Sequence, residues 1–233
     1  MKMLGIAISP KLPQGAKIVS FVNPYSLRQL ARSTISDREL SNIVFLSDGI
    51  MLCWLAFLLK GTRLYRQSFD GTSIGGQILK EASDSCARVA VVGGNSSIAM
   101  DFAAYIRNWS KRLTIAYTRN GYFSSEAEMA QAAREIVNSQ ANLVIVGMGA
   151  VVQEKMLLAL LREGFEGRAF TCGGFMDQTV ARGLYYYPEW VNRLNIRWAF
   201  RLASEPGRLW YRYFIEYPMF FWDLLFWSGR RPR

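Results

Sequence analysis

Short apolar runs that end in glycine turns alternate with longer amphipathic segments along this chain, and this alternation constrains its fold more than any other feature. The runs followed directly by glycine turns cover residues 88–92, 143–146 and 168–172. A near-continuous apolar run of this length is typical of a strand buried on both faces. The intervening segments predict helices over 98–109, 125–138 and 152–162. The pattern therefore predicts an α/β fold, with a parallel sheet covered by helices on both faces.

Further elements complete this pattern. Strands are also predicted over 16–22, 43–46 and 113–117, and helices over 25–33, 50–59 and 77–83. The helix over 50–59 is apolar nearly all round, so we expect it to be buried. This segment is the longest apolar run of the chain. It has half the length that a bilayer requires, and no membrane span is predicted.

Composition limits the partners of this chain. Of its 233 residues, 51% are apolar and 20% are charged, as in an ordinary globular protein. Lys and Arg number 28 against 18 acids, and the net charge of +10 indicates an anionic partner: a nucleic acid, a membrane surface or a phosphorylated substrate. The chain has no RNP-like run, zinc finger or helix-turn-helix signature, so no nucleic-acid partner is predicted.

The absence of histidine excludes whole classes of active site. Ser-His-Asp chemistry, Cys-His chemistry and imidazole metal sites all need that side chain. The three cysteines, Cys53, Cys86 and Cys172, lie far apart in the sequence without a C-x-x-C pair, which indicates neither a zinc site nor a disulfide framework. The sequence therefore indicates neither an imidazole metal site nor a zinc site.

Arginines and large apolar side chains form neighbouring helical rows near the C-terminus. Arg193, Arg197 and Arg201 recur at every fourth position, and an apolar row from Trp190 to Leu202 runs beside them. Residues four apart share a helix face, so an apolar stripe edged by guanidinium groups is predicted. Such a surface suits the boundary between hydrocarbon and anionic headgroups. A shift in composition near residue 185 divides the chain into a predicted α/β core, 1–185, and a helical membrane-docking appendage, 186–233.

The glycine turns mark a candidate ligand site. In open parallel sheets, ligands bind beyond the carboxyl ends of the strands, where glycines let a phosphate approach the N–H groups of a helix start. Gly93, Gly94, Gly147 and Gly149 occupy such positions and favour a nucleotide or phosphate site. Tight turning also needs glycine, so a structural role stays open. The G-x-G-x-x-G fingerprint of nicotinamide-binding domains is absent.

Charged side chains near strand ends are candidates for chemistry. Asp48, between a strand and an apolar helix, can accept a proton from an attacking hydroxyl or cap the helix as its N-cap residue. Glu154, just after Gly149, can bind a sugar hydroxyl or stabilise the positive end of a helix. The arginines of the appendage can grip a pyrophosphate or line a solvated helix face.

Several of these segments match motifs of one enzyme family. Their order and spacing from about residue 17 to residue 213 resemble the WecG/TagA/CpsF glycosyltransferases, glycosyltransferase family 26. The matching segments are Val22-Asn23-Pro24, Asp48-Gly49-Ile50, Gly71-Thr72, Val91-Val92-Gly93-Gly94, Asn120-Gly121-Tyr122-Phe123, Gly147-Met148-Gly149, Gln153-Glu154-Lys155, Gly173-Gly174-Phe175-Met176-Asp177 and Glu205-Pro206-Gly207-Arg208-Leu209-Trp210-Tyr211-Arg212-Tyr213.

The resemblance implies an inverting, metal-independent glycosyltransferase with a Rossmann-like core and no cofactor. Such enzymes move a sugar from a UDP-sugar to a polyprenyl-pyrophosphate-linked saccharide, at the cytoplasmic face of the cell membrane, in bacterial surface polysaccharide assembly. Asp48 matches the proposed catalytic base. The substrate-binding residues that the resemblance implies are Asn23 and Gly49 on the acceptor side, Gly93, Gly94, Gly147, Gly149, Gln153 and Glu154 on the donor side, and Arg201, Arg208 and Arg212 at the leaving diphosphate. Thr72, Asn120 and Gly121 are further substrate-binding residues, not assigned to either substrate.

Two alternatives stay open at this point. Where the family has Gly-Thr-Asp the chain has Gly71-Thr72-Ser73, and the lost carboxylate favours a non-catalytic, membrane-associated partner that retains the fold. The missing glycine fingerprint disfavours a Rossmann-like oxidoreductase. The sequence does not specify which sugar is transferred. It does not specify the oligomeric state either, and a homo-oligomer is one of the alternatives.

Overall fold

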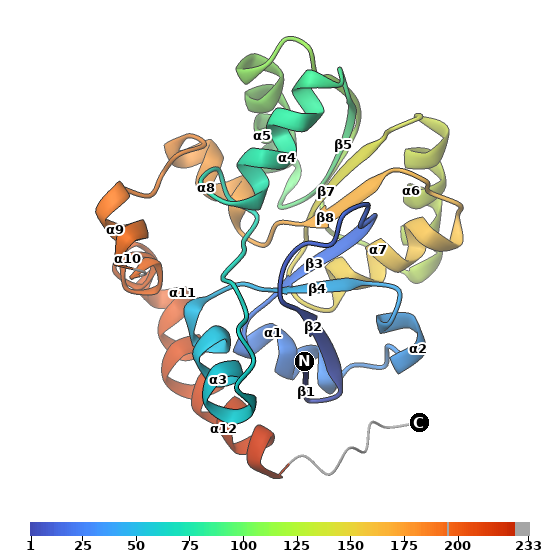
Figure 1. Cartoon of the computed structure of the whole chain (residues 1–233). Helices are drawn as coiled ribbons and strands as arrows, with labels where there is room; N and C mark the ends of the chain where they lie inside the picture. Colours follow the sequence, from blue (N-terminus) through green and yellow to red (C-terminus); the bar gives the residue numbers. More distant parts are fainter. Residues whose placement is uncertain (195, 227–233) are drawn as a thin grey trace. The chain divides into compact units, whose positions relative to one another are not determined.

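The structure, a computed structural model, describes residues 1–194 and 196–226, and at Asn192 and Arg208 it describes the backbone alone (Figure 1). Contacts divide the chain into two compact units. Unit 1 contains residues 1–13, residues 22–67 and the segment from 187 onward, and unit 2 contains residues 14–21 and 68–186. The appendage predicted from residue 186 thus shares a unit with much of the N-terminal part, and its separate role as a docking element stays a prediction.

Unit 2 is built on a wholly parallel sheet. Its strands lie in the order β3 (Ile18–Val22), β8 (Arg168–Thr171), β7 (Leu143–Gly147), β5 (Arg88–Gly93) and β6 (Thr114–Arg119). The central pairing of β5 with β7 sets Val92 opposite Val146 and Gly93 opposite Gly147. The strand interiors are fully buried, as the apolar runs predicted.

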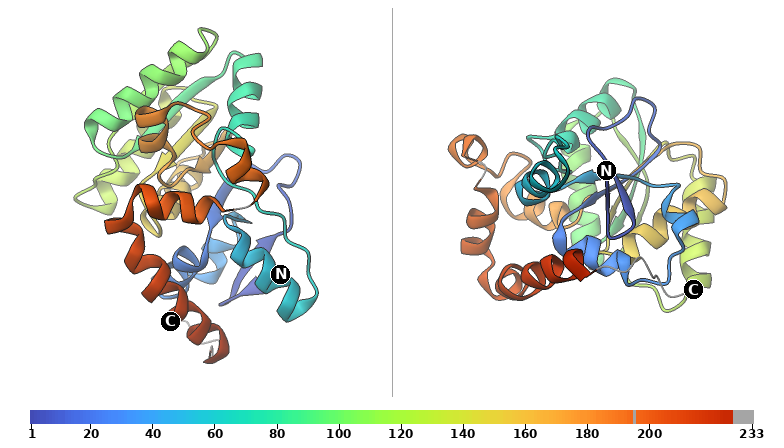
Figure 2. Two further views of the ribbon diagram at one scale, coloured as in Figure 1. Left: turned by 90° about the vertical axis from the view of Figure 1, so that its left-hand side faces the viewer. Right: turned by 60° about the horizontal axis from the view of Figure 1, so that its bottom comes forward.

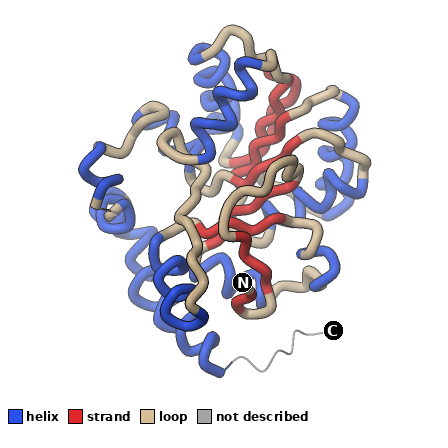
Figure 3. Tube along the Cα trace, viewed as in Figure 1, coloured by secondary structure: helices blue, strands red, loops and turns tan. Residues whose placement is uncertain are grey.

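Helices cover both faces of this sheet, with the strands between them (Figures 1 and 3). On one face α5 packs against α8, and on the other α6 packs against α7. The helices of unit 2 are α4 (Ile74–Asp84), α5 (Ser96–Trp109), α6 (Glu126–Asn138), α7 (Val152–Arg162) and α8 (Phe175–Arg182). Asn95 caps α5 and Ser125 caps α6 through their side chains. The predicted Rossmann-like α/β fold is confirmed.

Unit 1 holds three further strands, of which two form an N-terminal hairpin. β1 (Lys2–Met3) runs antiparallel to β2 (Ile6–Ser9), and β2 runs parallel to β4 (Val44–Ser47). The sequence analysis missed the hairpin, because its turn residues, Leu4 and Gly5, are not a common turn pair although both have positive φ. The helices before the C-terminal segment are α1 (Pro24–Ala31), α2 (Asp37–Leu40) and α3 (Ile50–Lys60).

The helix predicted over 50–59 is present as α3, but the prediction that it is buried is wrong. Only Leu52, Cys53 and Ala56 are buried. Trp54 and Leu58 are exposed, at 61% and 77% of their surface. The apolar pattern runs all round the helix, whereas the fold covers one side of it.

The C-terminal segment of unit 1 is a run of short helices, coloured orange to red in Figures 1 and 2. They are α9 (Glu189–Arg193), α10 (Arg197–Ser204), α11 (Pro206–Tyr211), the π-helix η1 (Arg212–Glu216) and α12 (Tyr217–Phe226). α12 and η1 pack against α1. No helix among residues 1–194 and 196–226 combines the length and the apolar character that a bilayer span needs.

The arginine row predicted along this segment is interrupted in the structure. α9 ends at Arg193 and α10 begins at Arg197, so the two side chains belong to different helices. Arg197 is buried, with its guanidinium 4.6 Å from the centre of the Tyr187 ring. The prediction that Arg193, Arg197 and Arg201 form one row along a helix is therefore wrong, because a spacing of four residues marks a common face only inside one unbroken helix.

Candidate functional site

The glycine turns of unit 2 meet at the carboxyl ends of its strands. The N–H of Gly94 donates to the carbonyl oxygen of Gly147 at 3.0 Å, and the N–H of Gly121 donates to the carbonyl oxygen of Gly94 at 2.9 Å. Asn120 donates from Nδ2 to the hydroxyl of Ser96, the first residue of α5, at 3.2 Å. The turns after β5, β6 and β7 thus converge at a helix start, where backbone N–H groups favour an anion.

Two of these glycines differ in how much space surrounds them. A Cβ atom at Gly93 would lie 2.4 Å from the carbonyl oxygen of Gly147, so only glycine fits there. At Gly149, whose φ is +83°, a Cβ atom would meet no described atom within 4 Å. Gly93 is therefore needed for the close approach of two strands, whereas Gly149 borders open space. Their predicted role in binding a donor stays a prediction.

The Gly93→Ala variant is expected to lower the free energy of unfolding by about 1–3 kcal/mol, because the added methyl group forces β5 and β7 apart. Urea denaturation of the variant and of the wild type measures this. Gly207→Ala is the matched control, since a Cβ atom there would have no described atom within 4 Å. An equal loss in both variants would contradict this account of Gly93.

Glu154 lies inside unit 2 and is fully buried. Its carboxylate accepts hydrogen bonds from the Ser20 hydroxyl at 2.6 Å, from Gln153 Nε2 at 3.0 Å and from the Val151 N–H at 2.6 Å. The last bond ties Glu154 to the first turn of α7, which is the stabilising role that the sequence left open. Burial raises its pKa above the usual range, and the three hydrogen bonds oppose that rise. A sugar hydroxyl would reach this carboxylate only if the surrounding structure opened.

The raised pKa of Glu154 predicts a pH-dependent stability. An unfolded chain releases this proton near the ordinary value of 4.5, whereas the folded protein holds it to higher pH. Stability is therefore lost as the pH rises through this interval. Because Glu154→Gln cannot titrate, its unfolding free energy relative to wild type should improve as the pH rises above the ordinary glutamate pKa of 4.5. Urea midpoints across this range measure the difference, with exposed Glu166→Gln as control. A difference that does not vary with pH would contradict the prediction.

Asp48 and Gly49 lie in unit 1, between β4 and α3. The N–H of Asp48 donates to the carbonyl oxygen of Val22 at 2.7 Å, which places it beside the predicted acceptor residue Asn23. The N-cap residue of α3 is Gly49, with φ of +115°, so Asp48 does not hold the N-cap position. The capping role left open for Asp48 is therefore wrong, and this half-buried residue lies two residues before the start of the helix.

The C-terminal helices bring two of the predicted arginines into the same environment as Asp48. Burial raises the pKa of Tyr217, Tyr213 and Asp48 raise it further, and Arg212 and Arg201 lower it. The Tyr217 hydroxyl is therefore within electrostatic reach of one carboxylate and two guanidinium groups. Sequence reasoning missed Tyr217, since nothing local distinguishes it from the other aromatic residues of this segment.

Arg212 is also fixed against the start of α1. Its guanidinium lies 4.5 Å from the centre of the Tyr25 ring, a cation–π contact. Asn23 caps α1, with its side chain accepting from the Ser26 N–H at 3.1 Å. Asn23 and Asp48, predicted together at the acceptor, thus lie in one part of unit 1 with Arg201 and Arg212, predicted at the leaving diphosphate.

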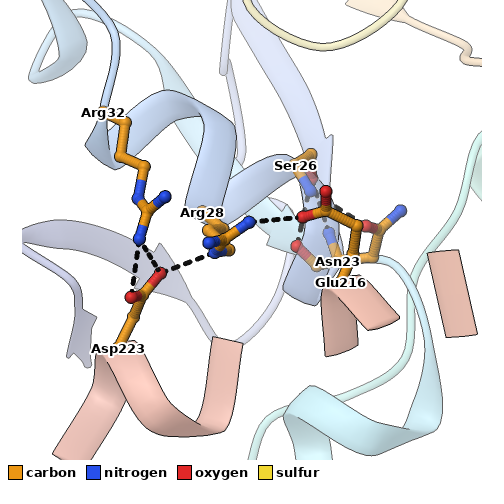
Figure 4. A network of polar contacts seen from close by, with 6 residues as sticks. All are labelled: Asn23, Ser26, Arg28, Arg32, Glu216 and Asp223. Atoms are coloured by element: carbon orange, nitrogen blue, oxygen red, sulfur yellow. Dashed lines mark hydrogen bonds and ion pairs between the residues drawn. The ribbon is translucent and has the colours of Figure 1, made fainter. Parts of the chain in front are cut away.

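A buried ionic network holds α12 and η1 against α1 (Figure 4). Arg28 donates from Nη1 to Glu216 at 2.6 Å and from Nε to Asp223 at 2.7 Å. Arg32 donates to both oxygens of Asp223, at 2.7 and 2.9 Å. Burial lowers the pKa of Arg28, but its hydrogen bonds to the two carboxylates outweigh this and raise it. In the sequence, the one indication of this network is Asp223, an acidic residue that interrupts an apolar segment.

The two remaining predicted residues are Thr72 and Arg208. The amide and hydroxyl of Thr72 donate to Asp70, at 2.9 and 2.8 Å, in the turn before α4. Asp70 is buried, so a carboxylate stands just before the Gly-Thr pair rather than just after it. The prediction for Arg208 falls on a side chain outside the described residues.

Comparison with known proteins gives a consistent result. The sequence model of the Glycosyl transferase WecG/TagA/CpsF family matches residues 6–233. One relative is the UDP-Gal:alpha-D-GlcNAc-diphosphoundecaprenol beta-1,4-galactosyltransferase of Shigella boydii, 31% identical over 204 residues that cover 87% of this chain and 83% of that protein. Another is the N-acetylglucosaminyldiphosphoundecaprenol N-acetyl-beta-D-mannosaminyltransferase of Bacillus subtilis (strain 168), 24% identical over 196 residues that cover 82% of this chain and 73% of that protein.

Fold and comparison agree on one class, a glycosyl transferase built on a Rossmann-like α/β sheet. The chain belongs to the WecG/TagA/CpsF family. The resemblance noted from the motifs is confirmed.

Proposed function

We propose that this protein transfers a sugar from a UDP-sugar to a polyprenyl-diphosphate-linked saccharide in the synthesis of a bacterial surface polysaccharide. Family membership supports the reaction type. The names of both relatives contain the same acceptor, an N-acetylglucosaminyl-diphosphoundecaprenol, and differ in the sugar transferred. The acceptor is therefore the better supported of the two substrates, and the donor sugar is the one to be found by experiment.

The observation that carries this proposal is the meeting of Asp48 and Arg212 at the start of α1, where the Asp48 N–H donates to Val22 and the Arg212 guanidinium lies over the Tyr25 ring. In the proposed step, an acceptor hydroxyl attacks the anomeric carbon of the donor while Asp48 takes the hydroxyl proton. The bond from the anomeric carbon to the UDP oxygen breaks, and UDP leaves with the negative charge. Attack opposite the leaving group inverts the anomeric centre.

In this proposal, fixed positive charge stabilises the departing diphosphate. A guanidinium keeps its charge at all physiological pH values and forms two parallel hydrogen bonds to phosphate oxygens. Arg201 and Arg212 are assigned this role, so that no metal ion is required. The glycine turns of unit 2, around Gly94 and Gly147, are assigned to the donor nucleotide, where their backbone N–H groups and the start of α5 favour an anion.

We propose that the protein acts at a membrane surface. In α12 and η1 the acids Glu216 and Asp223 turn toward α1, while large apolar side chains face outward. The exposed ones are Phe214, Met219, Phe221, Trp222, Leu225 and Phe226, and α11 adds Trp210 and Tyr211. A helix with its charges inward and its aromatic residues outward suits a lipid interface. We assign the protein to the cytoplasmic face of the cell membrane, peripherally bound through the C-terminal helices.

The test is transfer by the purified full-length protein to N-acetylglucosaminyl-diphospho-polyprenol. The donors are UDP-galactose, UDP-glucose, UDP-N-acetylmannosamine and a UDP-uronic acid, and product is detected by mass spectrometry. One donor is expected to give a product carrying one added sugar, at an unchanged rate in EDTA. No product from any donor, together with no binding of UDP by calorimetry, would contradict the proposal and favour the non-catalytic partner.

A further inference from the structure

The outer face of α3 is an exposed apolar surface that the functional proposal does not use. It is formed by Trp54, Phe57 and Leu58, which are exposed by 61%, 55% and 77%. Spacings of three and four residues place them on one side of the helix, opposite the buried Leu52 and Ala56. We call Trp54, Phe57 and Leu58 the α3 face.

Basic residues border the α3 face, and the sequence around it contains no acidic residue. Between Gly49 and Phe69 the chain has three basic residues and no acid. Lys60 and Arg63, which follow the face, are exposed. Lys11 lies 4.5 Å from the centre of the Tyr65 ring and adds another exposed cation to the same unit. An apolar face bordered by cations complements the boundary between acyl chains and anionic headgroups.

The α3 face also shares an end of unit 1 with the C-terminal helices. α3 begins two residues after Asp48, and α12 begins at Tyr217, on which the Asp48 charge acts. Figures 1 and 2 show α3 and α12 extending toward the same end of this unit. Both helices therefore start near the same carboxylate, and each exposes apolar side chains beyond it.

We propose that α3 is a second membrane anchor, whose α3 face lies in the interface of a bilayer with anionic lipids. The proposal rests on the proposed function only in that the same membrane carries the acceptor. Binding along α3 as well as along the C-terminal helices would hold Asp48 close to the headgroups. The hydroxyl of a lipid-linked saccharide is presented at that level.

The test uses the full-length Phe57→Ser/Leu58→Ser variant and vesicles of phosphatidylglycerol and phosphatidylethanolamine. Its vesicle partition coefficient is expected to fall about ten-fold or more relative to wild type. The matched control is Met100→Ser, which removes an exposed apolar side chain from α5 in the other unit and should bind like wild type. Leu58→Ser alone serves if the double variant does not fold by circular dichroism.

A second readout reports insertion directly. Brominated lipids quench tryptophan that enters the acyl region, so wild type should lose more fluorescence than Trp54→Phe does. Wild-type partition of the double variant, or equal quenching of wild type and Trp54→Phe, would overturn the proposal. A third outcome, measured by sedimentation, is a wild-type dimer that becomes a monomer in the double variant while vesicle binding stays intact. That outcome would overturn the proposal, and the α3 face would be the contact with a second copy of the chain.

Activity separates this proposal from the proposed function. On an acceptor with a short, water-soluble prenyl chain, the double variant should match wild type, whereas on acceptor embedded in vesicles its rate should fall about as far as its partition does. If wild type itself transfers no sugar, the proposed function fails, and vesicle partition still decides the role of α3.

Discussion

Replacing Asp48 with asparagine is expected to lower kcat by about 10²–10⁴-fold, the usual contribution of a general base. Asparagine keeps the size of the side chain but cannot take the proton of the acceptor hydroxyl. Asp48 is half-buried and does not cap α3, so the fold should tolerate the change. Initial rates at saturating donor and acceptor, compared with the urea midpoint of each protein, measure the two effects separately.

Asp101→Asn is the matched control for this variant. Asp101 is an exposed residue of α5, in unit 2, and its replacement should leave kcat and stability unchanged. A wild-type kcat for Asp48→Asn would remove Asp48 from the role of base. A large fall in stability would show that its carboxylate supports the fold instead.

Replacing Arg28 with alanine is expected to cost about 3–5 kcal/mol of unfolding free energy, because it removes the partner of the buried Glu216 carboxylate. The side chains of Arg28 and Glu216 are only 9% and 10% exposed, and their ion pair has a length of 2.6 Å. Arg28 also binds Asp223, which keeps Arg32 as a partner, so the loss of Arg28 should weaken the packing of η1 and α12 on α1. Urea denaturation measures the loss, and hydrogen exchange should show it first in residues 206–226.

Arg32→Ala is the control within the same network. Arg32 binds Asp223 at 2.7 Å, but its side chain is 52% exposed, so water already screens the pair. Its removal should cost less than about 1 kcal/mol. Equal losses in the two variants would mean that burial does not set the strength of this network.

Much of unit 2 could be predicted from local sequence patterns. The apolar runs before Gly93 and Gly147 are β5 and β7, and the predicted helix over 152–162 is α7 with the same bounds. Such elements are set by short-range rules: side-chain periodicity, capping residues and the need for glycine where backbones approach closely. The N-terminal hairpin escaped prediction because its turn pair is uncommon.

The candidate site could be predicted only in part. Asn23, Asp48 and the arginines of the C-terminal helices came from motifs, and the structure places the described ones in one unit. Tyr217 and the partners of Arg28 could not be found in this way, because they lie about 190 residues from α1 in sequence. Contacts over such separations depend on how whole elements pack, which no local pattern encodes.

The sequence by itself determined the order of the strands and helices of unit 2, the glycine turns and the family. Tertiary structure alone decided which side chains are covered. Glu154 is buried rather than at a surface, Arg197 packs on Tyr187, and the α3 face is left open to solvent. The physical reason is that periodicity reveals which faces of an element are apolar, whereas burial depends on whether another element packs against that face.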